Sequence, residues 1–352
     1  MEPQGAAAGL DRMASQASPK LIYVDDDLPG ITRKGAGKGW AYYDPDGKLI
    51  EDAAEKRRLN AIALPPAYSD AWFCPADNGH ILATGYDAKG RKQYRYHPAF
   101  RAQRESEKFD QLVLFGNRLP LVRKRVEADL AGRKLSRERA IASVVRLLDL
   151  GIVRVGNAGY SKSNKSFGAT TLRRRHAKLK GSTLVLTYKA KSGKQRTVRV
   201  TDRGLSRFVK KMQDLPGQNL FRYLDDDGVG HNVGSGEVNA YLREAMGADF
   251  TAKNFRTWHA SALAFAHLAQ AEERLGIASL MEVVAEKLGN TPAIARKSYV
   301  HPAVVALVER QEAWRAGLEL PRKTKWLGRE ERGLLEMLEK CGSAADLLPE
   351  VA

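Results

Sequence analysis

The period of the hydrophobic pattern changes near residue 104 of this 352-residue chain. Before that point, apolar runs of four or five residues stand between turn signals such as the Asp-Pro-Asp-Gly run at 44–47. This pattern is typical of short β-strands. Strands are expected at 21–24, 40–43, 80–84 and 89–97. The first part of the chain therefore predicts a small, mainly β domain.

Beyond residue 104, apolar residues recur every three or four positions, as in amphipathic helices. Two β-prone runs flank Lys-Ser-Gly-Lys at 191–194 and predict a hairpin with a basic tip. Helices are expected at 109–130, 136–150 with Gly151 as its stop, 203–213, 236–246, 252–270, 280–287, 302–315 and 330–341. The sequence thus predicts an α+β fold whose larger, mainly α domain contains a β-hairpin.

Composition adds the outer limits of these domains. Residues 1–19 have no apolar period and are predicted to be a disordered tail, which leaves 20–105 for the β domain and 106–352 for the α domain. No run reaches the roughly eighteen apolar residues of a membrane span, and the start lacks the apolar core of a secretory signal. We therefore expect a cytoplasmic protein without a membrane partner.

Charge is concentrated in one region. The net charge is +17, and residues 154–222 contain 18 lysines and arginines against only Asp202 and Asp214. Such a local excess is destabilised by self-repulsion unless a partner neutralises it. A polyanion is the favoured partner, and a charged membrane surface is the weaker alternative.

Several other chemistries lack support. Cys74 and Cys341 have no CxxC spacing, and the seven histidines form no HExxH motif. The Gly-rich run 35–39 lacks the Walker A spacing, so no nucleotide cofactor is expected. The acidic triplets 25–27 and 225–227 are interpreted as solvated turns. We expect neither a metal nor an organic cofactor.

The candidate chemistry lies in 288–302, where a basic segment with Gly and Pro contains Tyr299. A phenol with an ordinary pKa of about 10 is a poor nucleophile, but nearby cations favour the phenolate and hold an anionic substrate such as a phosphodiester. The alternative is a tyrosine that only packs against a helix.

Three cations are candidates for the same chemistry. Arg154 lies in an apolar stretch that carries it inward, and Arg256 lies early in the helix predicted at 252–270. The arginine fork can bond two phosphate oxygens, and a helix N-terminus adds to its attraction. Lys191, at the hairpin tip, is a candidate proton donor, and from the residues alone the neighbouring lysines suit this role equally well. The alternatives are a structural salt bridge for Arg154 and solvated side chains for Arg256 and Lys191.

This ordered set resembles the type IB DNA topoisomerases of the poxvirus and bacterial kind, over about 21–302. The matching features are Arg154 in Arg-Val-Gly, Lys191 on a hairpin, Arg256 in Lys-x-x-Arg, and Tyr299 seven residues after Leu-Gly-Asn-Thr-Pro. The resemblance implies that the arginines clamp the scissile phosphate, Lys191 protonates the leaving 5′ oxygen and Tyr299 forms a 3′-phosphotyrosyl intermediate.

The family pattern also has departures. Asn290 stands where viral members have histidine, and an amide donates a hydrogen bond without bringing positive charge. Asn157 and Gly159 replace lysines that contact DNA in viral members, so a viral-type sequence preference is in doubt. Positions that do match DNA contacts of the family are Gln93, Tyr94, Tyr96, Tyr160 and Lys253. The first three lie where basic and aromatic residues alternate at strand spacing, which suits an exposed strand equally well.

The resemblance implies a two-domain clamp around duplex DNA, with an N-terminal DNA-binding domain and a C-terminal catalytic domain. Such an enzyme relaxes supercoils without ATP or metal, acts as a monomer, and in a bacterium would be nucleoid-associated. A tyrosine recombinase is the nearest alternative, although recombinases usually show His-x-x-Arg where this chain has Lys253 and Arg256. A non-catalytic, basic DNA-binding protein is the alternative from another class.

Overall fold

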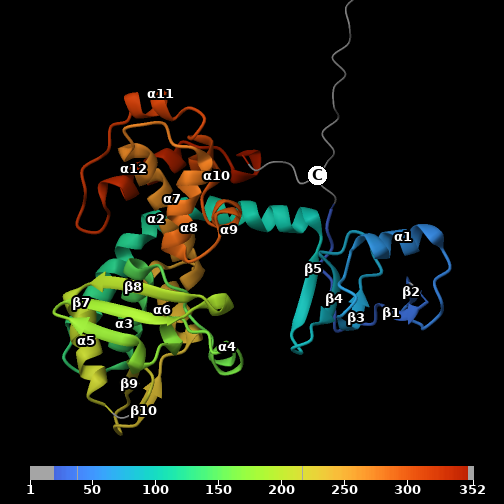
Figure 1. Cartoon of the computed structure of the whole chain (residues 1–352), viewed down its shortest axis with the longest axis horizontal. Helices are drawn as coiled ribbons and strands as arrows, with labels where there is room; N and C mark the ends of the chain where they lie inside the picture. The colour runs from blue at the N-terminus through green and yellow to red at the C-terminus, as the bar shows by residue number, and fades with distance from the viewer. Residues whose placement is uncertain (1–19, 38, 216, 348–352) are drawn as a thin grey trace, which may run out of the picture. The chain divides into compact units, whose positions relative to one another are not determined.

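The computed structural model describes residues 20–37, 39–215 and 217–347. The predicted disordered tail, 1–19, lies outside the described residues. The chain divides into two compact units, of which the first is formed by the residues up to Glu105 and the second by Ser106–Pro349 (Figure 1). Each unit buries its own hydrophobic core.

The first unit is built on one antiparallel sheet with the strand order β2-β1-β3-β4-β5. Its strands are β1 (Ile31–Ala36), β2 (Gly39–Tyr43), β3 (Ser69–Phe73), β4 (Ile81–Tyr86) and β5 (Lys92–Tyr96). The strand predicted at 21–24 is wrong, because Ile22 forms only an isolated bridge with Gly79. The sequence also missed α1 (Ala53–Ala61), which Asp52 caps by accepting from two backbone N–H groups.

One face of this sheet is buried. Ile31, Phe73 and Ala83 are at most 3% exposed. Ile31 is paired with Phe73, and Phe73 with Ala83, so the three side chains form a row across adjacent strands. The Tyr42 hydroxyl donates to Asn60 Oδ1 at 2.8 Å and connects α1 to β2. The strand β5 is left at the edge of the sheet, with most of its side chains exposed.

The second unit contains a three-stranded sheet, a two-stranded sheet and the remaining helices. Its strands are β6 (Ala177–Lys180), β7 (Thr183–Lys189), β8 (Gln195–Thr201), β9 (Arg222–Leu224) and β10 (Gly230–Asn232). Its helices are α2 (Pro98–Ala131), which begins in the first unit, α3 (Arg137–Gly151), α4 (Ala158–Ser163), α5 (Arg203–Gln213), α6 (Ser235–Met246), α7 (Ala252–Gln270), α8 (Ile277–Leu288), α9 (Pro292–Ser298), α10 (Pro302–Ala306), α11 (Gln311–Ala316) and α12 (Arg329–Glu339). The predicted α+β fold, with a β-hairpin inside the mainly α part, is confirmed. Within the described part, no helix is both long and apolar enough to span a membrane.

Several predicted boundaries are wrong. The helix α2 starts at Pro98 and not at 109, because proline fits the first turn of a helix. The helix predicted at 302–315 is two short helices, α10 and α11, with a turn at 307–310 between them. The β-branched residues Val304, Val305 and Val308 weaken helix propensity there.

The helix α7 lies at the centre of the second unit and packs against α3, α6, α8, α10 and α12 (Figure 1). Its side chains Phe255, Trp258 and Phe265 are at most 1% exposed. The strands β7 and β8 pack on α5 and α3, respectively. Because Arg256 lies between Phe255 and Trp258 on this buried helix, folding carries its charge into the core.

Candidate active site

Arg256 is the most deeply buried of the candidate residues, at 3% exposed. Its guanidinium donates to Ile152 O at 2.8 Å and to Leu288 O at 3.1 Å, at the C-terminal ends of α3 and α8. The alternative of a solvated first-turn arginine is therefore wrong. Arg256 Nε is buried and makes no hydrogen bond with a described residue, although an N–H group of Arg256 lies close enough to the Tyr299 phenol to lower its pKa. A buried charged donor without an acceptor is costly, and an anion bound here would satisfy this N–H.

Arg154 follows the end of α3, where the chain turns sharply. The cap residue is Ile152 and not the predicted Gly151, and it adopts the left-handed conformation at φ 50°. This conformation is strained for a β-branched residue. Arg154 O accepts from Ala169 N at 2.8 Å, which fixes the segment. The half-buried guanidinium donates through Nη2 to Asn290 Oδ1, so the structure brings these two candidate residues together.

Asn290 follows α8, whose C-cap is Gly289 in the left-handed conformation at φ 64°. Because Arg154 can only donate, its bond to Oδ1 fixes the orientation of the amide and turns Nδ2 away from the guanidinium. Nδ2 is buried and makes no hydrogen bond with a described residue, but it lies close enough to the Tyr299 phenol to lower its pKa. The alternative that Asn290 merely caps the turn is wrong, because the Thr291 hydroxyl caps α9 by accepting from Ile294 N.

Tyr299 caps the C-terminal end of α9, a short helix inside the segment that the sequence predicted as a turn. Its N–H donates to Ala295 O at 3.1 Å, and its carbonyl accepts from Ser261 Oγ of α7 at 3.3 Å. The guanidinium carbon of Arg256 lies 5.0 Å from the centroid of the Tyr299 ring. The phenol is therefore held beside the arginines by backbone and side-chain contacts.

The pKa values of the cluster are shifted by these neighbours. Burial raises the pKa of the Tyr299 phenol, but the charges of Arg256 and Arg154, together with the N–H groups of Arg256 and Asn290, outweigh burial and leave it below its ordinary value. Burial, and next the Arg154 charge, lower the pKa of Arg256 to about 10. The environment thus favours the phenolate, which is the nucleophilic form of tyrosine.

Lys191 is the candidate that the structure does not bring into contact with the cluster. It begins the turn between β7 and β8 and is exposed. Ser192 (φ 63°) and Gly193 (φ 73°) adopt left-handed conformations in this turn. Lys191 makes no hydrogen bond or ion pair with a described residue. Its ammonium is therefore exposed to solvent and available to a substrate.

The cluster contains cations but no balancing carboxylate. Among the described residues, neither Arg154 nor Arg256 forms an ion pair, so the predicted alternative of a structural salt bridge for Arg154 is wrong. Burying an unpaired charge is expensive. A phosphodiester presents oxygens that suit several arginine and amide donors at once.

The acidic triplet Asp25, Asp26 and Asp27 places carboxylate oxygens within 4.8 Å of one another in the first unit. Lys92 Nζ pairs with Asp26 at 2.9 Å and with Asp27 at 3.5 Å. The Asp26 side chain is 12% exposed, so the prediction of a fully solvated turn is wrong for this residue. The triplet anchors the edge strand β5, which begins at Lys92.

The predicted DNA-contacting residues occupy surfaces of both units. On β5, Tyr94 and Tyr96 are 42% and 39% exposed and stack with their centroids 5.7 Å apart. Gln93 Nε2 donates to Asp87 Oδ2 at 3.2 Å. Lys253 is exposed on α7. Tyr160 lies in α4, and its side chain falls outside the described part of the structure.

Two further residues contact the cluster and were not predicted from the sequence. Arg196 of β8 donates to Ile152 O at 3.3 Å and to Leu288 O at 3.1 Å, the carbonyls that Arg256 also contacts. Tyr188 of β7 is 3% exposed, and burial raises the pKa of its phenol although the charges of Arg196, Arg154 and Arg256 oppose the shift. Strand alternation placed Tyr188 on the buried face, but no sequence signal distinguished Arg196 from the other cations of the hairpin.

Comparisons with known proteins identify the class. The family model described as "Eukaryotic DNA topoisomerase I, catalytic core" matches residues 97–314, and that of "Bacterial DNA topoisomerase IB, N-terminal domain" matches residues 39–87. DNA topoisomerase 1B of Acanthamoeba polyphaga mimivirus is 31% identical over 288 residues, which are 78% of this chain and 85% of that protein. DNA topoisomerase 1 of Mycosarcoma maydis is 27% identical over 75% of this chain and 29% of that protein.

The chain therefore belongs to the type IB DNA topoisomerases. It is an isomerase of this class. Among solved structures, the XerH site-specific recombinase bound to palindromic difH substrate is 16% identical, over 55% of this chain and 51% of that chain, with a TM-score of 0.36. This TM-score is too low to bear on fold or function.

Proposed function

We propose that this protein relaxes supercoiled duplex DNA by transient cleavage of one strand, with Tyr299 as the nucleophile. The observation that carries the proposal is the position of the phenol beside Arg256, whose buried Nε has no acceptor, in a cluster without a carboxylate. A scissile phosphate would supply both the acceptor and the missing charge. Membership of the type IB family supports the same reaction.

In the proposed reaction, the Tyr299 phenol loses its proton to solvent, and its phenolate oxygen attacks the phosphorus while the bond to the 5′ oxygen breaks. Arg154, Arg256 and Asn290 Nδ2 hold the nonbridging oxygens, and Lys191 gives its proton to the leaving 5′ alkoxide. The product is a 3′-phosphotyrosyl bond and a free 5′ hydroxyl, which can swivel before it attacks and restores the phosphodiester. One phosphoester replaces another at each step, so no ATP is needed, and arginines in place of a metal hold the charge.

The first unit is the proposed DNA-binding domain, and the second is the proposed catalytic domain. Exposed, stacked Tyr94 and Tyr96 on the edge strand β5, with Gln93 beside them, suit contacts with sugars and bases. On the second unit, Lys253 lies one turn before Arg256 and suits a phosphate contact, and Tyr160 is the corresponding proposal on α4. Two such domains would enclose the duplex as a clamp, and binding should weaken steeply with salt.

The proposed setting is that of a bacterial enzyme that acts as a monomer at the nucleoid. The match of residues 39–87 to a bacterial N-terminal domain supports this origin. A monomer suffices because one chain carries all the proposed catalytic residues, with Arg154, Arg256, Asn290 and Tyr299 already in one cluster.

The test is relaxation of negatively supercoiled plasmid in EDTA without ATP, by the intact protein and by Tyr299→Phe. We expect relaxation by the first and none by the second, with a denaturant-trapped covalent adduct on the 3′ end of the cut strand for the first alone. Tyr188→Phe is the matched control, because it removes the other phenol near the same arginines. It should keep the adduct.

Other results would replace the proposal. If neither protein relaxes DNA although both bind it, the alternatives are a recombinase that needs its own sites or a non-catalytic DNA-binding protein. A trapped adduct without plasmid relaxation would favour the recombinase. An adduct retained by Tyr299→Phe and lost in Tyr188→Phe would move the nucleophile to β7.

A further inference from the structure

Among the described residues of the β7–β8 hairpin, Arg196 makes the most hydrogen bonds with helix ends. Its guanidinium donates to backbone carbonyls at the C-terminal ends of two helices, α3 and α8. The acceptors are Gly151 O (3.4 Å), Ile152 O (3.3 Å), Lys287 O (2.7 Å) and Leu288 O (3.1 Å). The last carbonyls of a helix have no partner within the helix and carry the negative end of its dipole. One cation therefore neutralises two helix ends at once.

These helix ends are the points from which the catalytic segments start. The segment with Arg154 begins directly after α3, and the segment with Asn290 begins directly after α8. Ile152, at the end of α3, adopts a strained left-handed conformation. The hydrogen bonds that its carbonyl accepts from Arg196 and Arg256 help to hold this conformation. Arg256 donates to two of the same carbonyls from the side of α7. The two arginines thus connect β8 and α7 to the ends of α3 and α8.

Arg196 also sets the position of the hairpin. It lies directly opposite Tyr188 in the β7–β8 register, and Tyr188 is buried on the same face. Lys191 begins the turn between these two strand positions. Among the described residues, Lys191 itself has no contact that fixes it. Two sets of contacts therefore connect the hairpin to the arginine cluster: the side-chain bonds of Arg196, and the backbone bond from Phe167 N to Lys189 O at 2.8 Å.

We infer that Arg196 is a positioning residue, which seats the β7–β8 hairpin against the ends of α3 and α8 so that Lys191 can reach the leaving 5′ oxygen. The inference rests on the proposed function, in which Lys191 is the acid. Arg196 touches backbone carbonyls and not the reacting atoms. Its loss should therefore slow the step that needs a proton more than it slows the attack by Tyr299.

The experiment compares two DNA substrates in single-turnover cleavage. One has the ordinary 5′ oxygen at the scissile bond, and the other has sulfur in its place. A thiol has a pKa near 8.5, so a thiolate leaves without a proton, whereas an alkoxide needs one. The variants are Arg196→Gln, Arg196→Lys and Lys191→Ala. Arg199→Gln is the matched control, because Arg199 is an exposed arginine on the same strand.

For Arg196→Gln, we expect cleavage of the oxygen substrate to slow by about 10- to 100-fold, a part of the 10² to 10⁴ that general acids contribute. Cleavage of the sulfur substrate should slow by less than about threefold on the same grounds. Arg196→Lys should lie between wild type and Arg196→Gln, and Arg199→Gln should resemble wild type. The ratio of the two rates comes from one preparation, so a partly unfolded variant does not distort it.

The outcomes separate this inference from the proposed function. If sulfur rescues Lys191→Ala but not Arg196→Gln, Arg196 acts elsewhere and the inference is overturned, while Lys191 remains the acid. An unchanged rate for Arg196→Gln on the oxygen substrate overturns the inference in the same way. If sulfur fails to rescue Lys191→Ala, the assignment of the acid is wrong, and the role of Arg196 falls with it.

Discussion

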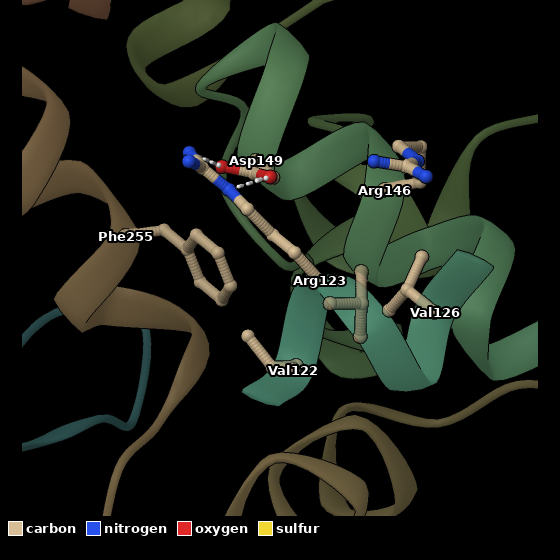
Figure 2. A pocket seen from close by; sticks show the side chains of 7 residues that line it. Val122, Arg123, Val126, Arg146, Asp149 and Phe255 are labelled. Carbon is tan, nitrogen blue, oxygen red and sulfur yellow. Dashed lines mark hydrogen bonds and ion pairs between the residues drawn. The ribbon is translucent and has the colours of Figure 1, made fainter. Parts of the chain in front are cut away.

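The second unit contains two buried arginine clusters with opposite charge balance. In the first, Arg123 of α2 donates to both oxygens of Asp149 at 2.9 Å and to both oxygens of Glu331 at 2.8 Å (Figure 2 shows its contacts with Asp149). In the second, Arg256 and Arg154 have only carbonyl and amide acceptors. The first cluster contains carboxylates that balance the charge of its arginine, whereas the second contains none among the described residues.

The pKa shifts of the two arginines point in opposite directions. Burial lowers the pKa of Arg123, but the charges of Asp149 and Glu331 outweigh it and raise the pKa above its ordinary value. No carboxylate offsets burial at Arg256, and its pKa falls to about 10. The carboxylates around Arg123 offset the cost of burying its charge, whereas Arg256 has none and, in the proposed function, receives an anionic substrate instead.

Arg123→Met tests the balanced cluster and should give the largest effect on stability. Removal of Arg123 leaves Asp149 with the His259 imidazole and Glu331 with neutral donors, so we expect a loss of about 3–5 kcal/mol in the free energy of unfolding, measured in urea. Arg125→Met on the same helix is the control, because Arg125 is 36% exposed and should contribute about 1 kcal/mol or less. Equal losses of unfolding free energy for the two variants would show that the contacts of Arg123 with Asp149 and Glu331 stabilise the protein no more than an exposed ion pair does.

Arg256→Lys tests the unbalanced cluster. Lysine keeps the charge but cannot donate to two carbonyls and a phosphate oxygen with the same rigid fork. We expect single-turnover cleavage to slow by about 10² to 10³, the usual effect of losing a donor to a transition-state oxyanion. Arg123→Lys serves as the counterpart. It should lower stability and leave the cleavage rate of the folded protein unchanged, and a slower cleavage step in it would remove the distinction between the clusters.

The sequence predicted which residues form the cluster without carboxylates, but it did not predict how their side chains are arranged. Local motifs identified Arg154, Arg256 and Tyr299, whose side chains the fold then brings together. Arg196 could not be found this way, because its acceptors at 151–152 and 287–288 are far away in the chain. Long-range contacts of this kind depend on packing and leave no local pattern.

Secondary structure was likewise predicted well where the local pattern is clear and missed where the pattern is too short or distant contacts decide the conformation. The long helices α5 and α7 were predicted at their exact ends because their apolar periods are clear. The short helix α9 was missed because seven residues give too little periodicity. The left-handed cap at Ile152 was missed because the contacts of its carbonyl, and not its own propensity, hold that conformation.

His301 provides a titration test of burial without a balancing charge. It is 4% exposed. Burial lowers its pKa from 6.5 to about 4, with Asp110 opposing and Lys108 adding to the shift. The unfolded chain therefore binds the proton more tightly, and stability is lost as the pH falls from about 6.5 to about 4, by about 3 kcal/mol.

Unfolding free energies of wild type and His301→Asn across this pH range measure the effect. Asparagine can still cap α10, as His301 Nδ1 does by accepting from Ala303 N at 3.1 Å. Subtracting the two pH profiles removes the contributions of the acidic residues. Parallel profiles would mean that His301 does not account for the loss.

Asn290→Ala should have a smaller effect on catalysis than Arg256→Lys. It removes the Nδ2 donor and the acceptor that orients Arg154, but no charge. We expect cleavage and religation to slow by about tenfold, because a hydrogen bond to a charged group contributes about 1.5–3 kcal/mol and part of this is recovered by water. Unchanged rates for both steps would assign Asn290 no direct role in the transition state.

Asn290→Asp adds a carboxylate to the cluster of Arg154 and Arg256, which has none, and should have the smallest effect on stability. The carboxylate keeps an acceptor for Arg154 and supplies the negative charge that the cluster lacks, so the free energy of unfolding should rise by about 1 kcal/mol or less for this half-buried site. The same carboxylate repels a phosphate, so cleavage should slow while the free protein becomes more stable. A variant that is both less stable and slower would show that the arginines are already balanced in the free protein, and the comparison between the two clusters would fail.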